Sequence, residues 1–173
     1  CMKVLTHIIK NRFEKGEKIL DFGCGGGGLV QELIDSGYDA YGTDIHFKSG
    51  KYRDRLIEQN RLVLIENIKS RSNIDSEAYR IPFNGEEFDI VVSDQTIEHV
   101  NNLEQYVAES RRVLKNTGIF YGYFPSRLKA IEPHVGVPLG GVVNNKLYYR
   151  FCYKLGLCER KIKSADELIK YMA

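Results

Sequence analysis

The stretch Lys18-Ile-Leu-Asp-Phe-Gly-Cys-Gly-Gly-Gly-Gly28 decides the fold of this chain. It begins with a short, mostly apolar run and continues into consecutive glycines, a pattern that predicts a buried strand followed by a tight turn. Leu29, Val30, Leu33 and Ile34 then recur at helical spacing, so the turn opens a helix. Glycines at such a turn let the backbone bend sharply and let a ligand approach without clashes from Cβ atoms.

The rest of the body alternates strands with helices. We expect a helix before Gly16, strands at 40–43, 72–75, 88–92 and 119–124, and an amphipathic helix that starts after Asn102 and stops at Gly118. The run from Leu62 to Ile65 fits a helix or a strand equally well. This alternation predicts a doubly wound, mostly parallel α/β sheet with a Rossmann-like arrangement, whose ligands bind at the carboxyl ends of the strands.

The glycine loop by itself leaves several ligands open. Gly23, Gly25 and Gly28 satisfy the GxGxxG pattern of dinucleotide-binding loops. Asp21 argues against a pyrophosphate, because a carboxylate there repels an anion and suits a ligand with a cationic end. Asp44 ends the second strand, where it can accept both hydroxyls of a ribose, and this would serve NAD equally well. These residues therefore leave open an NAD(P)-dependent oxidoreductase, a non-catalytic binding module, and an enzyme whose nucleoside cofactor has a cationic end.

Several motifs in order resemble the class I S-adenosylmethionine-dependent methyltransferases, in particular their small-molecule branch with a methyltransferase type 11-like domain. The matching segments are 19–27, 41–45, 77–83, 88–93, 93–100 and 113–120. The resemblance runs from about residue 18 to residue 124. It implies the methyltransferase fold, S-adenosyl-L-methionine as the cofactor and S-adenosyl-L-homocysteine as its product.

The resemblance also implies a cofactor site built from these motifs. Its members are Asp21, Gly23, Cys24 and Gly25 at the methionine end, Asp44 at the ribose, Ile45 at the adenine face, Glu77 and Ala78 at the adenine edge, and Ser93 and Gln95 near the sulfonium. The family usually carries Asp at the position of Glu77, and Asp75 is the alternative acidic residue.

Two histidines are candidates for a catalytic base. His99 follows the predicted strand at 88–92, and His134 lies in a proline-flanked loop beyond the last predicted strand. Either imidazole could take a proton from an acceptor hydroxyl, although His99 also suits a role in supporting its loop. No histidine has a partner at metal-ligand spacing, so we expect no metal site.

Composition and charge bear on the compartment and the partners. Four cysteines form neither a CxxC pair nor a zinc spacing, no apolar run is long enough to cross a bilayer, and no signal peptide is recognisable, so we expect a cytoplasmic protein. Residues 127–173 hold nine Lys and Arg against four Asp and Glu, a net charge of about +5 within a total of +2. A basic tail suits an anionic partner, or it is an ordinary solvated helix face.

We divide the chain into an adenosylmethionine-binding core at 1–124 and a mostly helical, basic lid or acceptor segment at 125–173 within the same domain. The segment 146–155 interleaves basic and aromatic residues, which fits inward-packing aromatics of a lid helix or a surface for an anionic or lipid-linked acceptor. We expect a small-molecule, glycan or lipid-linked acceptor. A membrane surface and a second copy of the chain stay open as partners, and no nucleic-acid module accompanies the basic residues.

The end of the chain raises the question of completeness. The family's sheet has seven strands, whereas the sequence predicts five, with a short basic candidate at 160–163. Ser164-Ala-Asp-Glu167 is a capping box that opens a final helix. An edge strand without a partner is an aggregation liability. We therefore expect that the sheet lacks its last two strands. Either the chain is part of a longer protein, or the open edge is covered by 125–173 or by a second copy of the chain.

Overall fold

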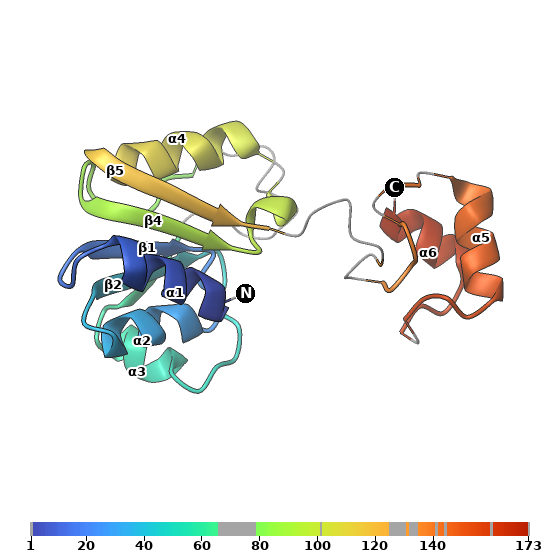
Figure 1. Cartoon of the computed structure of the whole chain (residues 1–173), viewed down its shortest axis with the longest axis horizontal. Helices are drawn as coiled ribbons and strands as arrows, with labels where there is room; N and C mark the ends of the chain where they lie inside the picture. The colour runs from blue at the N-terminus through green and yellow to red at the C-terminus, as the bar shows by residue number, and fades with distance from the viewer. Residues whose placement is uncertain are drawn as a thin grey trace. The chain divides into compact units, whose positions relative to one another are not determined.

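The structure is a computed structural model of the chain, and it describes residues 2–65, 79–100, 102–124, 131, 135–140, 142–143, 145–159 and 161–172. The chain divides into two compact units, residues 1–124 and residues 125–173 (Figure 1). In chain order the first unit contains α1 (Met2–Arg12), β1 (Lys18–Phe22), α2 (Gly28–Asp35), β2 (Asp39–Asp44), α3 (Arg53–Glu58), β3 (Leu62–Leu64), β4 (Phe88–Asp94), the 3₁₀ turn η2 (Ile97–His99), α4 (Leu103–Val113) and β5 (Leu114–Tyr123).

The first unit is built on one parallel sheet. Its strand order is β3-β2-β1-β4-β5, and every pairing between neighbouring strands is parallel. The chain moves outward from β1 to β3 and then returns to the other side of β1 at β4, so the order reverses between β1 and β4. Ligands on open α/β sheets bind at the carboxyl ends of the strands beside such a reversal. The predicted doubly wound α/β fold is confirmed.

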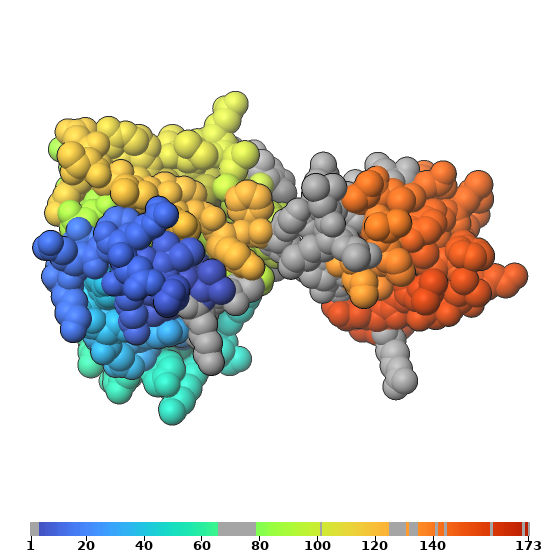
Figure 2. Space-filling model, in the orientation of Figure 1, coloured from blue at the N-terminus to red at the C-terminus, as the bar shows by residue number. Residues whose placement is uncertain are grey.

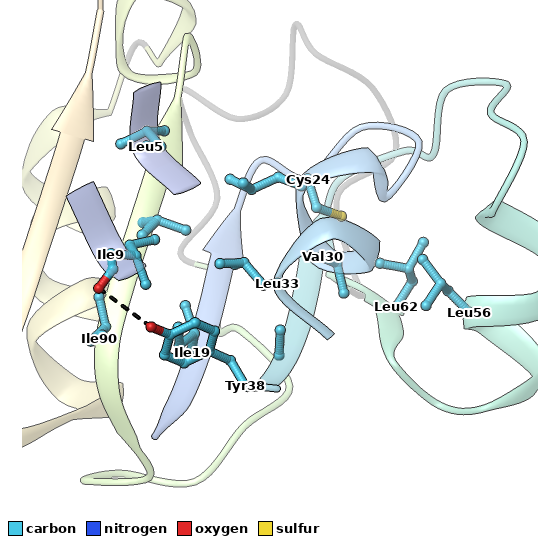
Figure 3. Close-up of a cluster of buried hydrophobic side chains, with 13 residues drawn as sticks. Leu5, Ile9, Ile19, Cys24, Val30, Leu33, Tyr38, Leu56, Leu62 and Ile90 are labelled. Atoms are coloured by element: carbon cyan, nitrogen blue, oxygen red, sulfur yellow. Dashed lines mark hydrogen bonds between the residues drawn. The ribbon is translucent and has the colours of Figure 1, made fainter. Parts of the chain in front are cut away.

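Two separate cores cover the two faces of this sheet, because successive residues of a strand point to opposite sides. On one face, side chains from α1, α2 and α3 pack on the strands, as Figure 3 shows for Leu5, Ile9, Leu33 and their neighbours. The Tyr38 hydroxyl group closes this cluster by donating to the carbonyl of Ile9 at 3.4 Å, the dashed line in Figure 3. On the other face, Tyr106 and Val113 of α4 pack with the strand residues.

The aromatic content distinguishes the second face. Phe22 stacks on Tyr106 with ring centroids 4.2 Å apart, and Phe88 meets Phe83 edge-on at 5.0 Å. Phe83 belongs to the segment 79–83, which lies against the sheet beside α4 and is buried at Tyr79 and Ile81. The first face is mainly aliphatic. Side chains at the strand ends therefore have aliphatic neighbours on one face of the sheet and aromatic neighbours on the other.

Several expected boundaries need correction. The run from Leu62 to Ile65 forms strand β3, whereas the strand expected at 72–75 lies outside the described residues. Asn102 caps α4 as expected, with its side chain accepting from the Gln105 N–H at 3.0 Å. The helix, however, ends at Val113 and not at Gly118. Gly118 lies inside β5, where an added Cβ would come within 3.1 Å of the Asp89 carbonyl oxygen, so this glycine serves strand packing.

Strand β5 is one edge of the sheet. Beyond its buried first residue it is half-exposed or exposed along its length, and Figure 2 shows its side chains, coloured yellow to orange, at the surface of the first unit. Ile119 and Phe120 are 45% and 37% exposed. Among the residues that the structure describes, no strand pairs with the outer edge of β5. That a longer protein, the segment 125–173 or a second copy accounts for this open edge stays a prediction.

The second unit has a small core of its own. Helices α5 (Lys146–Lys154) and α6 (Ala165–Met172) bury Tyr149, Cys152 and Leu168 together. Ser164 caps α6 by accepting from the Glu167 N–H at 3.0 Å, as the capping box predicts. The candidate strand at 160–163 does not form over its described residues 161–163, because the Ile162 N–H donates to the Glu159 carbonyl in a turn. No helix of the described residues combines the length and hydropathy needed to cross a bilayer.

An ion pair within α4, between the buried Glu109 and the half-buried Arg112, joins this helix to the segment 79–83. The carboxylate of Glu109 is bound by the guanidinium of Arg112 at 2.7 Å and accepts from the Ile81 N–H at 2.8 Å. Arg112 also donates to the carbonyls of Ile81 and Phe83. Burial by itself would raise the pKa of Glu109, but the hydrogen bonds from Arg112 and Ile81 outweigh it and hold that pKa below its ordinary value. The pair therefore satisfies backbone groups that no strand partner satisfies.

We predict that Glu109→Gln lowers the free energy of unfolding by about 2 kcal/mol near pH 7, because the half-buried guanidinium of Arg112 loses its charged partner. The matched control, Glu104→Gln at an exposed position of the same helix, should change it by less than about 0.5 kcal/mol. Since the pKa of Glu109 is lowered in the folded state, its ionised carboxylate stabilises the fold above pH 4.5. This stabilisation is lost as the pH falls through the folded pKa. Urea unfolding at pH 7 and pH 4 measures both effects, and equal values for the two variants would contradict the prediction.

Candidate functional site

The glycine loop after β1 is fastened to the end of β2. The N–H groups of Gly23 and Cys24 both donate to the carbonyl of Thr43, at 2.8 and 3.2 Å. One residue further, the Gly25 N–H donates to Asp44 Oδ2 at 2.8 Å. Three successive backbone N–H groups thus point at the end of one neighbouring strand, which fixes the loop where α2 begins.

Two glycines in this region leave no room for a side chain. A Cβ on Gly23 would come within 2.2 Å of the Thr96 hydroxyl oxygen, and the φ of Gly23 is +92°, in the left-handed region. A Cβ on Gly42 would come within 2.8 Å of Cys24 Sγ. The loop after β1 is therefore packed directly against the backbone of β2 on one side and against the segment after β4 on the other.

Three carboxylates share one face at the ends of neighbouring strands. Residues two or four positions apart in a strand point to the same face. Asp21 therefore shares a face with Ile19 in β1, and Asp44 with Ala40 in β2. Asp94 shares a face with Ile90 and Val92 in β4. Ile19, Ala40, Ile90 and Val92 all belong to the cluster covered by α1, α2 and α3. The strand order puts β2, β1 and β4 side by side, so these three acids line one edge of the sheet beside the glycine loop.

The electrostatics of this edge are unfavourable in the protein alone. Asp21 is 3% exposed, and its Oδ1 atom is buried without a hydrogen-bond partner in the described part of the chain. Burial, with the nearby charges of Asp94 and Asp44, raises the pKa of Asp21 to about 8. Burial also raises the pKa of Asp94, and its Oδ1 atom likewise lacks a partner among the described residues. Groups of this kind suit a ligand that brings a positive charge.

S-adenosylmethionine has the chemistry that this site requires. It carries an ammonium group and a sulfonium, which suit the unpartnered carboxylate oxygens of Asp21 and Asp94. It also carries a ribose diol, which suits Asp44, because Gly25 and His46 hydrogen-bond that carboxylate and orient it. The glycines admit a ligand backbone where a Cβ would stand. Within the described residues, no three acidic, His or Cys groups stand close enough to hold a metal ion.

The structure brings some of the predicted site residues together and not others. Asp21, Gly23, Gly25 and Asp44 meet at the loop. Cys24 is 7% exposed and packs its Sγ against Gly42, so its side chain fills the core. Ile45 is half-buried against the aromatic cluster. The remaining predicted residues Glu77, Ala78 and His134, with the alternative Asp75, lie outside the described residues.

The predicted site residues at and beyond the end of β4 have different surroundings. Ser93 is 1% exposed and follows Val91, which belongs to the aromatic cluster on the opposite face. Gln95 is exposed and has a left-handed backbone with a φ of +54°, and its N–H donates to the Tyr123 carbonyl at 2.8 Å. His99 ends the 3₁₀ turn η2 and is exposed.

Sequence reasoning missed two residues of this site, Asp94 and Thr96. Thr96 packs on Gly23 and donates from its hydroxyl to the Gly23 carbonyl at 3.4 Å. Asp94 completes the set of three carboxylates. The signal for Asp94 was present, because strand alternation puts position 94 on the face of Ile90 and Val92. Nothing in the sequence marks the contact of Thr96, which depends on how two strand ends meet.

Comparisons with known proteins agree with this geometry. Residues 20–122, more than half of the chain, match the family described as the methyltransferase domain. The mitochondrial ubiquinone biosynthesis O-methyltransferase of Rattus norvegicus is 36% identical over 120 residues, which cover 69% of this chain and 34% of that protein. The ubiquinone biosynthesis O-methyltransferase of Pelagibacter ubique is 27% identical over 107 residues, covering 62% of this chain and 41% of the relative. The chain thus spans about two fifths of the length of the curated relatives it matches.

Solved structures show the same fold. The PH0226 protein of Pyrococcus horikoshii has a TM-score of 0.53 and 28% identity over 72% of this chain and 54% of its own. An S-adenosylmethionine-dependent methyltransferase of Aquifex aeolicus has a TM-score of 0.55 and 19% identity over 90% of this chain and 74% of its own, which supports the fold. The family match decides among the ligands that the glycine loop left open. With its parallel sheet, its glycine loop and the acids around it, the chain belongs to the methyltransferase domain family, among the class I S-adenosylmethionine-dependent methyltransferases.

Proposed function

We propose that the protein transfers a methyl group from S-adenosylmethionine to a hydroxyl oxygen of a small-molecule, glycan or lipid-linked acceptor. The observation that carries the cofactor part is the buried Asp21 beside a glycine loop, whose Oδ1 atom has no hydrogen-bond partner among the described residues. The names of several similar curated relatives describe O-methylation in ubiquinone biosynthesis, which supports oxygen as the methylated atom. One further relative is named as a sterol 24-C-methyltransferase, so carbon is the alternative.

The proposed roles follow the surroundings of each residue. Asp21 holds the ammonium group of the cofactor, and Asp44 accepts from the two ribose hydroxyls. The backbone of Gly23 and Gly25 lies against the methionine portion, and Ile45 offers an apolar contact to the adenine. Ser93, Gln95, Cys24, Glu77 and Ala78 stay candidates from the family resemblance, and His99 and His134 stay candidates for the base.

Catalysis requires little from side chains in such a site. When bound, the sulfonium supplies an activated methyl group. The protein's task is then to hold the acceptor oxygen in line with that methyl and to take up the proton that the acceptor hydroxyl loses. The fastening of the glycine loop to Thr43 and Asp44 provides the rigidity that this positioning needs.

The second unit is our candidate for the acceptor or lid segment. Helix α5 packs Tyr149 and Cys152 inward, whereas Leu147, Phe151 and Leu155 are 74%, 57% and 55% exposed. These three follow one another at intervals of four, as do the flanking basic residues Lys146, Arg150 and Lys154. An apolar row beside a basic row suits an acceptor that has both an apolar portion and a negative charge.

Labelled-methyl transfer into a fractionated cell extract tests the proposed function. We expect the label in the small-molecule, glycan or lipid fraction and expect it to be released by treatments that cleave methyl ethers. Label found mainly in RNA or protein would contradict the proposed acceptor class. A chain that binds the cofactor and labels no fraction would favour a non-catalytic binding module.

We predict that Asp44→Ala weakens the binding of S-adenosylhomocysteine about tenfold or more, because hydrogen bonds from two hydroxyls to a charged acceptor are lost, each worth roughly 1.5–3 kcal/mol before compensation by water. Calorimetric titration measures the dissociation constant. Asp54→Ala is the matched control, since its side chain is 78% exposed on α3. An unchanged affinity for Asp44→Ala would remove this residue from the site.

We further predict that Asp21→Asn stabilises the ligand-free protein while impairing cofactor binding. Since the pKa of Asp21 is raised to about 8, the folded state keeps a proton between pH 4 and 8 that the unfolded chain releases, and stability falls as the pH rises through this range. The variant removes this penalty, so its melting temperature should exceed that of the wild type at pH 8 and equal it near pH 4.

The cofactor provides the second half of this test. S-adenosylmethionine should raise the melting temperature of the wild type and raise that of Asp21→Asn far less, because a neutral amide cannot pair with an ammonium group. Asp54→Asn should change neither value. A variant that is less stable than the wild type at pH 8, or that responds fully to the cofactor, would show that Asp21 is a structural acid.

A further inference from the structure

Asp94 is the one carboxylate of the shared face to which the proposed function gives no specific role. It is the last residue of β4 and lies two positions beyond Val92, which pairs in register with Asp21. Parallel register therefore brings Asp94 level with Gly23. The Thr96 hydroxyl joins the two positions, since it lies 3.3 Å from the Asp94 carbonyl oxygen and 3.4 Å from that of Gly23.

The side chain of Asp94 carries a charge that the described residues do not neutralise. Its Oδ1 atom is buried without a hydrogen-bond partner, whereas both oxygens of Asp44 accept backbone N–H groups. The negative charge of Glu98, which follows in η2, raises the pKa of Asp94. Asp94 in turn raises the pKa of Asp21 on the adjacent strand. Negative charge therefore accumulates here, and it favours a cationic group beside Asp94.

The charges of the cofactor and its product differ by one. S-adenosylmethionine has two cationic groups, the ammonium and the sulfonium, whereas S-adenosylhomocysteine keeps the ammonium and has a neutral thioether. Asp21 is the more deeply buried acid and lies under the glycine loop, where the ammonium is proposed to bind. The sulfonium is then the remaining cation, and Asp94 is the remaining carboxylate.

We infer that Asp94 is a specificity-determining residue that makes the site prefer the sulfonium form of the cofactor over the thioether product. The inference rests on the proposed function, because it assumes S-adenosylmethionine as the ligand. Once the methyl group has left, the sulfur is neutral, and the attraction to Asp94 is lost. The carboxylate therefore strengthens binding of the cofactor and adds nothing to binding of the product, so cofactor displaces product more readily.

Titration calorimetry with three ligands tests this role without an acceptor. The ligands are S-adenosylmethionine, S-adenosylhomocysteine and sinefungin, an analogue in which a protonated amine replaces the sulfonium centre. All three share the ammonium, the ribose and the adenine, and only the first and last carry the second cation. The proteins are the wild type, Asp94→Asn and the control Asp54→Asn, which removes an acid that is 78% exposed on α3.

We expect the wild type to bind the two dicationic ligands about tenfold more tightly than S-adenosylhomocysteine, the effect of a partly screened ion pair. Asp94→Asn should bring all three dissociation constants within about twofold of one another and leave that of S-adenosylhomocysteine nearly unchanged. Asp54→Asn should keep the wild-type preference. In the wild type, raising the salt concentration should weaken the dicationic ligands more than S-adenosylhomocysteine.

Other outcomes would overturn the inference. Equal weakening of all three ligands by Asp94→Asn would assign Asp94 to the ammonium or to loop support. An unchanged preference in this variant would remove Asp94 from the site, and equal salt effects in the wild type would contradict the role without any variant. Melting curves show whether Asp94→Asn is folded. If it is not, the three dissociation constants are measured for Asp94→Ser instead. A wild type that binds none of the three ligands would refute the proposed function itself.

Discussion

The site depends on the close contact between the glycine loop and the end of β2. The Thr43 carbonyl accepts two N–H groups of the loop, and Gly42 leaves the space into which Cys24 packs. A side chain at Gly42 would push the loop away from β2 and break the bond between Gly25 and Asp44. The position of the loop, the start of α2 and the orientation of Asp44 therefore follow from one contact between two backbones.

The electrostatics of the site depend on the strand order. The loop lies where the strand order gathers Asp21, Asp44 and Asp94 on one face, and burial of Asp21 keeps water from screening its charge. A folded protein gains no stability from such an arrangement, and the raised pKa values of Asp21 and Asp94 express that cost. Unfavourable groups of this kind concentrate at functional sites, where a ligand supplies the missing charge.

The parts that the sequence predicted are those decided by nearby residues. The strand and loop at 18–28, Asp44 at the end of β2 and the Asn102 cap all follow from local patterns. The end of α4 was predicted wrongly because Gly118 resembles a helix stop, whereas the pairing of β5 with β4 takes over directly after Val113. Thr96 was missed for a similar reason, since its contact with Gly23 joins positions 73 residues apart. Long-range pairing overrides local signals in both cases.

Strand alternation explains how one sheet gives the site two different sides. On the face of α1, α2 and α3, the strands end in carboxylates above an aliphatic core. On the face of α4, they carry Phe22, Tyr41 and Phe88, and Ile45 continues this apolar surface beyond β2. A single register shift in β1 or β4 would exchange the two sides and put the acids among the aromatic rings. The register of the sheet, set by the buried residues beneath the site, thus separates the charged side of the site from its apolar side.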